Sequence, residues 1–228
     1  MCGRYVLTNP KALADAFKIE APAFDASWNI APTQVAPVLR ATLPVDENDP
    51  TPAGFAMSTM RWGLVPGWSK GPNHGPTLFN ARSEGAAEKP AYREAFAERR
   101  CLIPADGFYE WQSIPGSKDK QPYFIKLAKS PMVFAGLWES WTSRRDGSTL
   151  LSFCILTTEP NDLVAELHSR MPVILPKVDW DTWLLGTIDD ALDMLRPYPA
   201  SEMMAFKVGP DVGNVKNNGA GLIKPLIV

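Results

Sequence analysis

The feature that most limits the possible folds is a succession of short apolar runs with few long helical segments between them. We predict strands at residues 3–7, 35–39, 55–66, 79–83, 123–127, 132–138, 150–157 and 204–208, a strand–turn–strand unit at residues 101–111, and a strand after residue 172. Chains with βαβ units place a helix of about 10–15 residues between successive strands, a pattern missing here. We therefore predict an α+β fold, predominantly antiparallel with mixed β-sheets and several short flanking helices.

The predicted helices are short and lie at residues 10–19, 90–100, 161–167, 178–185 and 189–195. Asn9 and Pro10 supply a cap and a first-turn proline for the first helix. Arg99 and Arg100 end the second, where the helix dipole favours cations. We expect an exposed loop at residues 41–53, which are rich in proline and acidic residues, and irregular backbone at residues 69–76.

The 228 residues show no internal repeat, low-complexity tract or linker between two cores, which favours a single domain over residues 1–228. Three cysteines without a close pair argue against a disulfide framework and fit a reducing compartment. Without a leader-like segment or an apolar run of about 20 residues, we expect a cytoplasmic protein with no membrane contact. We also expect a monomer. The formal charge of −2 means that a contact with nucleic acid would need a local groove.

Cys2 follows the initiator methionine and is small enough for Met1 to be removed. The new amino terminus would then carry an amine and a thiol, which titrate near about 8 and 8.5, so we expect part of each to be reactive at neutral pH. Amines form Schiff bases with aldehydes, and a neighbouring thiol can add to the imine and close a thiazolidine ring. The alternative is that Cys2 merely packs under a strand.

Few other residues can assist such chemistry, since the chain has only two histidines. His74 lies in a Gly/Pro/Asn loop, where we expect it to be solvated. His168 follows a predicted helix, where it can face a cleft or cap the helix C-terminus. Strand alternation puts the Glu110 carboxylate on the face opposite Tyr109 and Trp111. If buried it needs a partner, which the Cys2 amine could supply.

Asn80 and Arg82 lie two residues apart on an extended segment and so point to the same side, as suits orienting a sugar and gripping its phosphate. The cysteines lack metal-binding spacing, and no HExxH, GxSxG, Walker or GxGxxG pattern occurs. We therefore expect no metal and no cofactor. Cys101 and Cys154 lie in apolar strands and are predicted to be core residues.

Eight motifs occur in a fixed order: MCGRY (1–5), WNIAPTQ (28–34), RWGLVPGW (61–68), FNARSE (79–84), CLIPADGFYEW (101–111), TTEPN (157–161), HSRMP (168–172) and a late VGNVKNNG. In these motifs the chain resembles, nearly end to end, the SOS-response-associated peptidase (SRAP) family of abasic-site processing proteins. The resemblance implies one SRAP domain with a barrel-like fold. It also implies a lyase-like activity in which Cys2 captures the ring-opened aldehyde of an abasic site in single-stranded DNA as a thiazolidine, with autoproteolytic loss of Met1. DNA engagement would bring the protein to the nucleoid.

The resemblance also assigns residues. It places Cys2, Asn80, Glu110 and His168 in the active site, and it lines the DNA groove with Arg4, Pro32, Trp68, Arg82, Thr157 and Arg170. In these positions His168 would protonate the sugar ring oxygen, Glu110 would move protons at the amine, and the arginines would bind phosphates. Trp68 and Pro32 would stack on bases, although Trp68 could instead pack in the core.

Three alternatives remain open from the sequence. A thiol peptidase would process its own N-terminus or other chains. An N-terminal-nucleophile amidohydrolase of the glutamine amidotransferase type also begins with Met-Cys-Gly, and it would release ammonia from glutamine. A noncatalytic binder of single-stranded DNA would keep its affinity after Cys2→Ala and form no covalent product.

Overall fold

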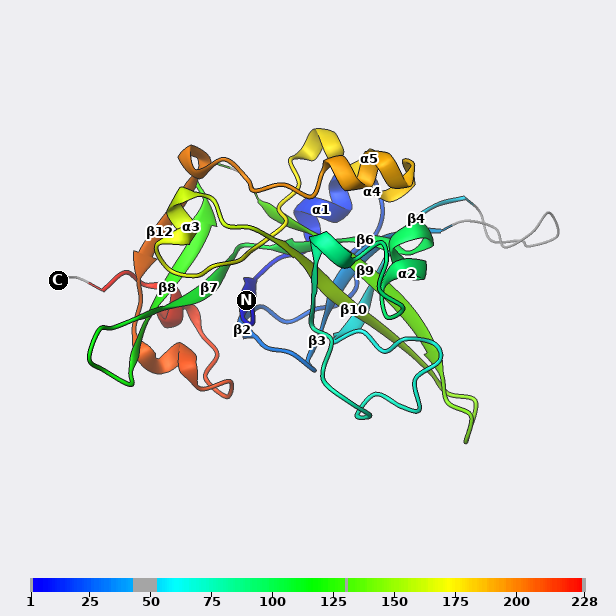
Figure 1. Cartoon of the computed structure of the whole chain (residues 1–228), viewed down its shortest axis with the longest axis horizontal. Helices are drawn as coiled ribbons and strands as arrows, with labels where there is room; N and C mark the ends of the chain where they lie inside the picture. The colour runs from blue at the N-terminus through cyan, green and yellow to red at the C-terminus, as the bar shows by residue number, and fades with distance from the viewer. Residues whose placement is uncertain (1, 43–52, 130, 227–228) are drawn as a thin grey trace.

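The computed structural model describes residues 2–42, 53–129 and 131–226, and twelve strands lie in these segments (Figure 1). They are β1 (Tyr5–Leu7), β2 (Ser27–Ile30), β3 (Val35–Thr42), β4 (Gly54–Trp62), β5 (Asn80–Arg82), β6 (Arg100–Ala105), β7 (Gly107–Ser113), β8 (Lys120–Leu127), β9 (Met132–Thr142), β10 (Thr149–Thr158), β11 (Met171–Pro172) and β12 (Met203–Lys207). The prediction for residues 41–53 falls largely on residues 43–52, outside the described residues.

Five strands form a closed barrel in the order β10-β4-β3-β6-β9, which the pairing of β9 with β10 completes. Most pairs are antiparallel, but β10 runs parallel to both β4 and β5. The short strand β11 pairs with the end of β10. The predicted class, α+β with predominantly antiparallel mixed sheets and a barrel-like arrangement, is confirmed.

The second sheet has the order β12-β8-β7-β1-β2 and is antiparallel throughout. The predicted turn at Asp106 and Gly107 exists, but the strands on either side do not form a hairpin, since β6 belongs to the barrel and β7 to this sheet. Asp106 accepts hydrogen bonds from the Thr8 amide and hydroxyl, at 2.8 and 2.6 Å. A Cβ at Gly107 would lie 2.4 Å from the Ile125 carbonyl oxygen, so only glycine fits where the chain changes sheet.

The helices are shorter than predicted. The α-helices are α1 (Lys11–Ala16), α2 (Arg93–Glu98), α3 (Asp162–Ala165), α4 (Trp180–Leu185) and α5 (Ile188–Asp193). Single turns of 3-10 helix lie at Ser83–Gly85, Lys177–Asp179, Ala200–Glu202, Pro210–Gly213 and Ala220–Ile223. The first helix was predicted to reach residue 19. It ends at Ala16, and Lys18 adopts the left-handed conformation with φ of 55°.

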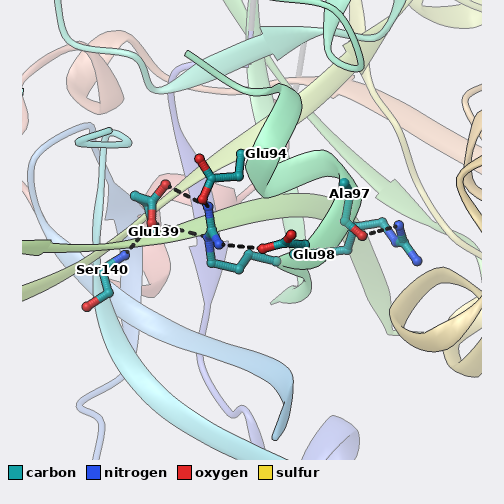
Figure 2. A network of polar contacts seen from close by, with 7 residues as sticks. Glu94, Ala97, Glu98, Glu139 and Ser140 are labelled. Atoms are coloured by element: carbon teal, nitrogen blue, oxygen red, sulfur yellow. Dashed lines mark hydrogen bonds and ion pairs between the residues drawn. The ribbon is translucent and has the colours of Figure 1, made fainter. Parts of the chain in front are cut away.

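The two arginines after α2 have different roles (Figure 2). Arg100 is buried and donates to the carbonyls of Phe96 and Ala97, which confirms the predicted capping of the helix end. Arg99 instead pairs with Glu139 of β9 and with Glu94 and Glu98 of α2. Arg100 therefore caps α2, and Arg99 links α2 to strand β9 of the barrel.

The largest core cluster joins the barrel to the second sheet. Tyr5 of β1 packs edge-on against Trp62 of β4 and Phe134 of β9, with ring centroids 5.2 and 5.9 Å apart. Cys101 and Cys154 are fully buried, as predicted for core residues. Strand β1 of the second sheet is thus packed against the barrel, which positions the residues that precede it.

Candidate active site

Cys2 lies at the junction of the two sheets, fully buried. On the N-terminal side of β1 the chain remains paired with β7, because the Tyr109 N–H donates to the Arg4 carbonyl at 3.0 Å. From the barrel side, Asn80 Nδ2 donates to the Cys2 carbonyl at 2.8 Å. Both sheets therefore hold the backbone of the predicted nucleophile.

Asn80 begins β5 and is held by three contacts. It pairs with Ile155 in β10, Tyr92 donates its hydroxyl to the Asn80 carbonyl at 3.3 Å, and Trp62 Nε1 donates to the preceding carbonyl, that of Phe79, at 2.8 Å. The Asn80 Oδ1 atom is buried and accepts no hydrogen bond from the part of the chain that the structure describes. Such an acceptor suits an N–H or O–H donor arriving in the site.

Glu110 in β7 is only 3% exposed. Tyr109 and Trp111 share the opposite face, with ring centroids 6.4 Å apart, so the predicted alternation holds. Burial raises the pKa of Glu110, and the positive charge of His168 acts against this rise. A carboxyl with a raised pKa exchanges protons closer to neutral pH than an exposed glutamate does.

With Met1 attached, the surroundings of the Cys2 thiol disfavour its ionisation, and partial ionisation at the processed N-terminus stays a prediction. Burial raises its pKa well above the ordinary value and the negative charge of Glu110 raises it further, while a hydrogen bond from the Arg4 backbone lowers it. Burial beside Glu110 therefore favours the protonated thiol. A neighbouring base is therefore needed before the sulphur can act.

His168 lies three residues beyond Ala165, the last residue of α3. Its backbone N–H donates to the Val164 carbonyl at 2.8 Å and closes the last turn. In the neutral ring with its proton on Nε2, the Nδ1 atom accepts the Arg170 backbone N–H at 3.0 Å; in the charged ring Nδ1–H can instead donate to the Arg170 carbonyl, which lies at 3.3 Å. The charge of His168 also acts on Glu110. His168 therefore belongs to the same site as Glu110 and Cys2.

Arg170 sits at the edge of this site with its guanidinium held on two sides. It pairs with both Glu84 carboxylate oxygens, one at 2.8 Å, and donates to the Thr157 carbonyl. The Arg170 hydrogen bond lowers the pKa of Glu84 to about 2. Arg82 is exposed next to Thr157 in the β5–β10 pairing. Thr157 itself is fully buried: its hydroxyl donates to the Ala81 carbonyl and its own carbonyl accepts from Arg170, and a contact of Thr157 with DNA stays a prediction.

Arg4 is already engaged within the protein. Its guanidinium donates to Asn29 Oδ1 at 3.0 Å and to the Val212 carbonyl at 2.8 Å. Asn29 in turn donates to the carbonyls of Val212, Asn214 and Asn217. This network, the Arg4–Asn29 network below, ties the C-terminal segment to β1 and β2. Contact of Arg4 with DNA stays a prediction.

The two predicted stacking residues differ in exposure. Trp68 is 66% exposed, so the alternative of core packing is wrong. Pro32 is half-buried in the turn between β2 and β3, beside Thr33, whose φ of 77° is left-handed. His74 is exposed in its loop, as predicted. Trp68 and His74 both lie in the loop between β4 and β5 and line one pocket there.

The structure adds residues that received no role from the sequence. Glu84 is the last residue of the FNARSE motif. Its carboxylate, two positions after Arg82, was the sequence signal that could have indicated an ion-pair partner for an arginine of the site. Asn29 lies in the WNIAPTQ motif, but its partners are more than 180 residues away. Within the described residues, no group of three or more His, Cys, Asp or Glu side chains could hold a metal. None of the helices among them is long and apolar enough to cross a membrane.

Known proteins are similar to this chain over most of its length. The sequence model of the family "SOS response associated peptidase (SRAP)" matches residues 1–215. The abasic site processing protein YoaM of Bacillus subtilis is 38% identical, covering 98% of this chain and 97% of its own. The abasic site processing protein HMCES of Xenopus tropicalis is 32% identical over 86% of this chain and 64% of its own.

Solved structures share the fold. A protein from Bacteroides thetaiotaomicron superposes with a TM-score of 0.83, covering 99% of this chain and all of its own, at 22% identity. A protein from Bordetella bronchiseptica gives a TM-score of 0.76 at 29% identity, covering 91% of this chain and 100% of its own. The family model spans most of the sequence, and YoaM aligns over nearly the whole of both chains. This chain belongs to the SOS response associated peptidase family.

Proposed function

We propose that this protein processes abasic sites in single-stranded DNA by capturing the ring-opened sugar on Cys2 as a thiazolidine. The observation that carries the proposal is the convergence of Cys2, Asn80, Glu110 and His168 from four distant segments, with Cys2 and Glu110 buried and Asn80 and His168 half-buried. The relatives' names, abasic site processing proteins, supply the substrate class. Removal of Met1 frees the Cys2 amine. It also puts a cation beside the thiol, which opposes the raised pKa.

The reaction needs no metal and no redox partner. The Cys2 amine adds to the sugar aldehyde, and loss of water leaves an imine. The sulphur then adds to the imine carbon, and its proton ends on nitrogen. One C–N and one C–S bond form, water leaves, and nothing is oxidised or reduced.

Three side chains around Cys2 supply the proton transfers and orient the amine. The abasic sugar is mostly a closed hemiacetal, and His168 Nε2–H is the donor that can protonate its ring oxygen. Glu110, with its raised pKa, accepts protons from the ammonium and from the thiol. Asn80 Oδ1 accepts a hydrogen bond from the amine or a sugar hydroxyl without adding charge. Arg82 and Arg170 bind the flanking phosphates.

Removal of Met1 is assigned to the same groups, with the Met1–Cys2 peptide bond hydrolysed at the site. To distinguish autoprocessing from processing by the host, the protein is expressed while the host methionine aminopeptidase is inhibited, and the mass of the intact protein is then measured. The wild-type chain loses Met1 and Glu110→Ala retains it. Retention of Met1 by both chains would contradict autoprocessing and leave DNA capture untouched.

DNA capture is tested by incubating the processed protein with a single-stranded oligonucleotide that carries one abasic site, followed by a denaturing gel. Wild type gives a shifted band and Cys2→Ala gives none. Glu110→Ala, expressed with the host aminopeptidase active and shown by intact mass to have lost Met1, gives the band slowly. An unshifted oligonucleotide would overturn the proposal. Noncovalent binding without a band would favour a simple binder, and release of ammonia from glutamine would favour an amidohydrolase.

A further inference from the structure

The helices α4 and α5, which lie in the yellow to orange part of the chain in Figure 1, are held against the barrel by buried hydrogen bonds. Trp183 Nε1 in α4 donates to the Cys101 carbonyl of β6 at 2.9 Å. The buried guanidinium of Arg100 donates to the carbonyls of Trp183 and Gly186 at the end of α4. The outer face of the two helices is therefore a surface that the fold has already formed.

This outer face carries four large apolar side chains that are between 42% and 85% exposed: Val178, Leu185, Ile188 and Leu192. Val178 and Leu185 lie seven residues apart, the spacing of about two helical turns, so they share one side of the segment. Ile188 and Leu192 lie four residues apart on α5 and share a side as well. Single exposed apolar residues are ordinary, but a group of four is typical of a binding surface. We call this surface the α4–α5 face.

The α4–α5 face is also acidic. Residues 177–196 contain five aspartates and two cations: Asp179, Asp181, Asp189, Asp190, Asp193, Lys177 and Arg196. Phosphate groups of DNA and anionic lipid headgroups would be repelled by this charge. A symmetric pair of copies would place the same aspartates against one another, because such a dimer uses one face twice. The charge therefore favours a partner that is both basic and apolar.

The α4–α5 face lies across the barrel from part of the candidate active site. Helix α4 packs against β3 and β6. In the closed order β10-β4-β3-β6-β9, these are the two strands that do not border β10. Strand β10 pairs with β5, which carries Asn80. A partner can therefore occupy the face while the site holds DNA.

We propose that the α4–α5 face binds a basic amphipathic helix of a partner protein. The apolar side of that helix covers the four exposed apolar side chains, and its lysines or arginines lie against the surrounding aspartates. The inference is independent of the proposed function, since the face contains no residue of the candidate active site.

The probe is a fluorescently labelled peptide of leucine and lysine, about 14 residues or four turns long, with the leucines along one side of the helix. One comparison peptide has glutamate in place of lysine. The other has the same composition in an order that forms no apolar side. By fluorescence anisotropy, wild type binds the first peptide at least about tenfold more tightly than either comparison peptide, because only the first matches both the apolar side chains and the charge.

Two substitutions test the apolar and the acidic parts of the face. Leu185→Ser weakens binding of the leucine–lysine peptide at least about fivefold, the loss for a contact worth about 1 kcal/mol. Met204→Ser, which truncates a similarly exposed side chain on β12, is the matched control and leaves binding unchanged. Asp181→Asn weakens binding about twofold at low salt. Asp119→Asn removes an exposed aspartate between β7 and β8 and has no such effect.

Equal affinity for the three peptides, or equal affinity of wild type and Leu185→Ser, would overturn the inference. Self-association in analytical ultracentrifugation that Leu185→Ser abolishes would assign the face to a second copy and also overturn it. Melting curves check folding, and Val178→Ser gives a second reading at a more exposed residue. Both variants keep their affinity for tetrahydrofuran DNA, single-stranded DNA in which a stable tetrahydrofuran replaces the abasic sugar. Loss of DNA and peptide affinity together in both variants would show general damage and overturn the inference.

Discussion

Glu110 is the residue whose environment matters most for the proposed chemistry. Its burial raises its own pKa, and its charge raises the pKa of the Cys2 thiol. Burying a charged carboxylate lowers the free energy of unfolding, so the burial that suits Glu110 to proton transfer also destabilises the folded protein. The Glu110 carboxylate is therefore expected to contribute to catalysis at a cost in stability.

Glu110→Gln separates the two effects. We expect capture of abasic-site DNA to slow about 10²- to 10⁴-fold, the usual loss for a general acid–base group. The folded-state pKa is raised above the ordinary value of about 4.3, so wild-type stability falls as pH rises between these two values. Glutamine does not titrate. Melting curves from pH 4 to 8 should show the variant more stable than wild type at the upper end. Equal stability across this range, or an unchanged rate, would contradict the account.

Glu84→Gln tests whether the ion pair with Arg170 holds the segment that positions His168. Glu84 is 60% exposed, so we expect stability to change by less than about 1 kcal/mol. The capture rate should fall while affinity for tetrahydrofuran DNA is largely kept, because Arg170 remains available to phosphate. Glu98→Gln also removes an exposed partner of an arginine, outside the site, and is the matched control. Equal effects of the two substitutions would show that Glu84 has no role in positioning.

The sequence could predict part of this site. Strand alternation correctly separated Glu110 from its two aromatic neighbours, because it depends only on local geometry. Packing of Cys2 under a strand was one of two alternatives that the sequence left open. Its full burial and the raised pKa of its thiol could not be decided from the sequence, since they depend on the barrel and the second sheet closing around the N-terminus. The Arg4–Asn29 network was missed for the same reason: it joins residues 208 positions apart.

At the scale of elements, the short helix α3 holds His168. Asn161 caps it by accepting the Val164 N–H at 3.0 Å, and the last turn ends on the His168 backbone. Asn161→Ala should cost about 0.5–2 kcal/mol, with a melting temperature lower by about 2–4 °C for each kcal/mol. It should also slow capture, because the His168 segment loses its support.

Thr187→Ala is the control for that prediction. Thr187 forms a capping box with Asp190 at α5, so its loss costs a similar amount of stability. This helix carries no residue of the candidate site, and the capture rate should not change. A rate that falls equally in both variants would show that the effect of Asn161→Ala is general destabilisation.

Element types were more predictable than their ends or partners. Apolar runs identified most strands, but β2 was missed because Trp28 and Asn29 give no apolar alternation. The turn at Asp106 and Gly107 was predicted, whereas the passage from one sheet to the other was not. That passage depends on Thr8 and the strand β1, which lie about 100 residues earlier.

At the scale of the whole molecule, the formal charge of −2 leaves DNA binding to local cations. Noncovalent affinity for tetrahydrofuran DNA should therefore fall only modestly with salt. Two or three phosphate contacts predict a slope of about −1.4 to −2.1 in a plot of log affinity against log salt. Arg82→Gln should reduce the slope by about 0.7. A slope unchanged by Arg82→Gln would exclude a phosphate contact at this residue.

The most direct test of the central claim asks whether nitrogen and sulphur of Cys2 both end on the same sugar carbon. The chain has three cysteines. After capture of an abasic-site oligonucleotide, the product is denatured and alkylated with iodoacetamide, and its mass is measured by mass spectrometry. A thiazolidine leaves only Cys101 and Cys154 to react, and the adduct maps to the Cys2 peptide. Alkylation of all three cysteines in the crosslinked chain, or an adduct on a lysine, would contradict the account.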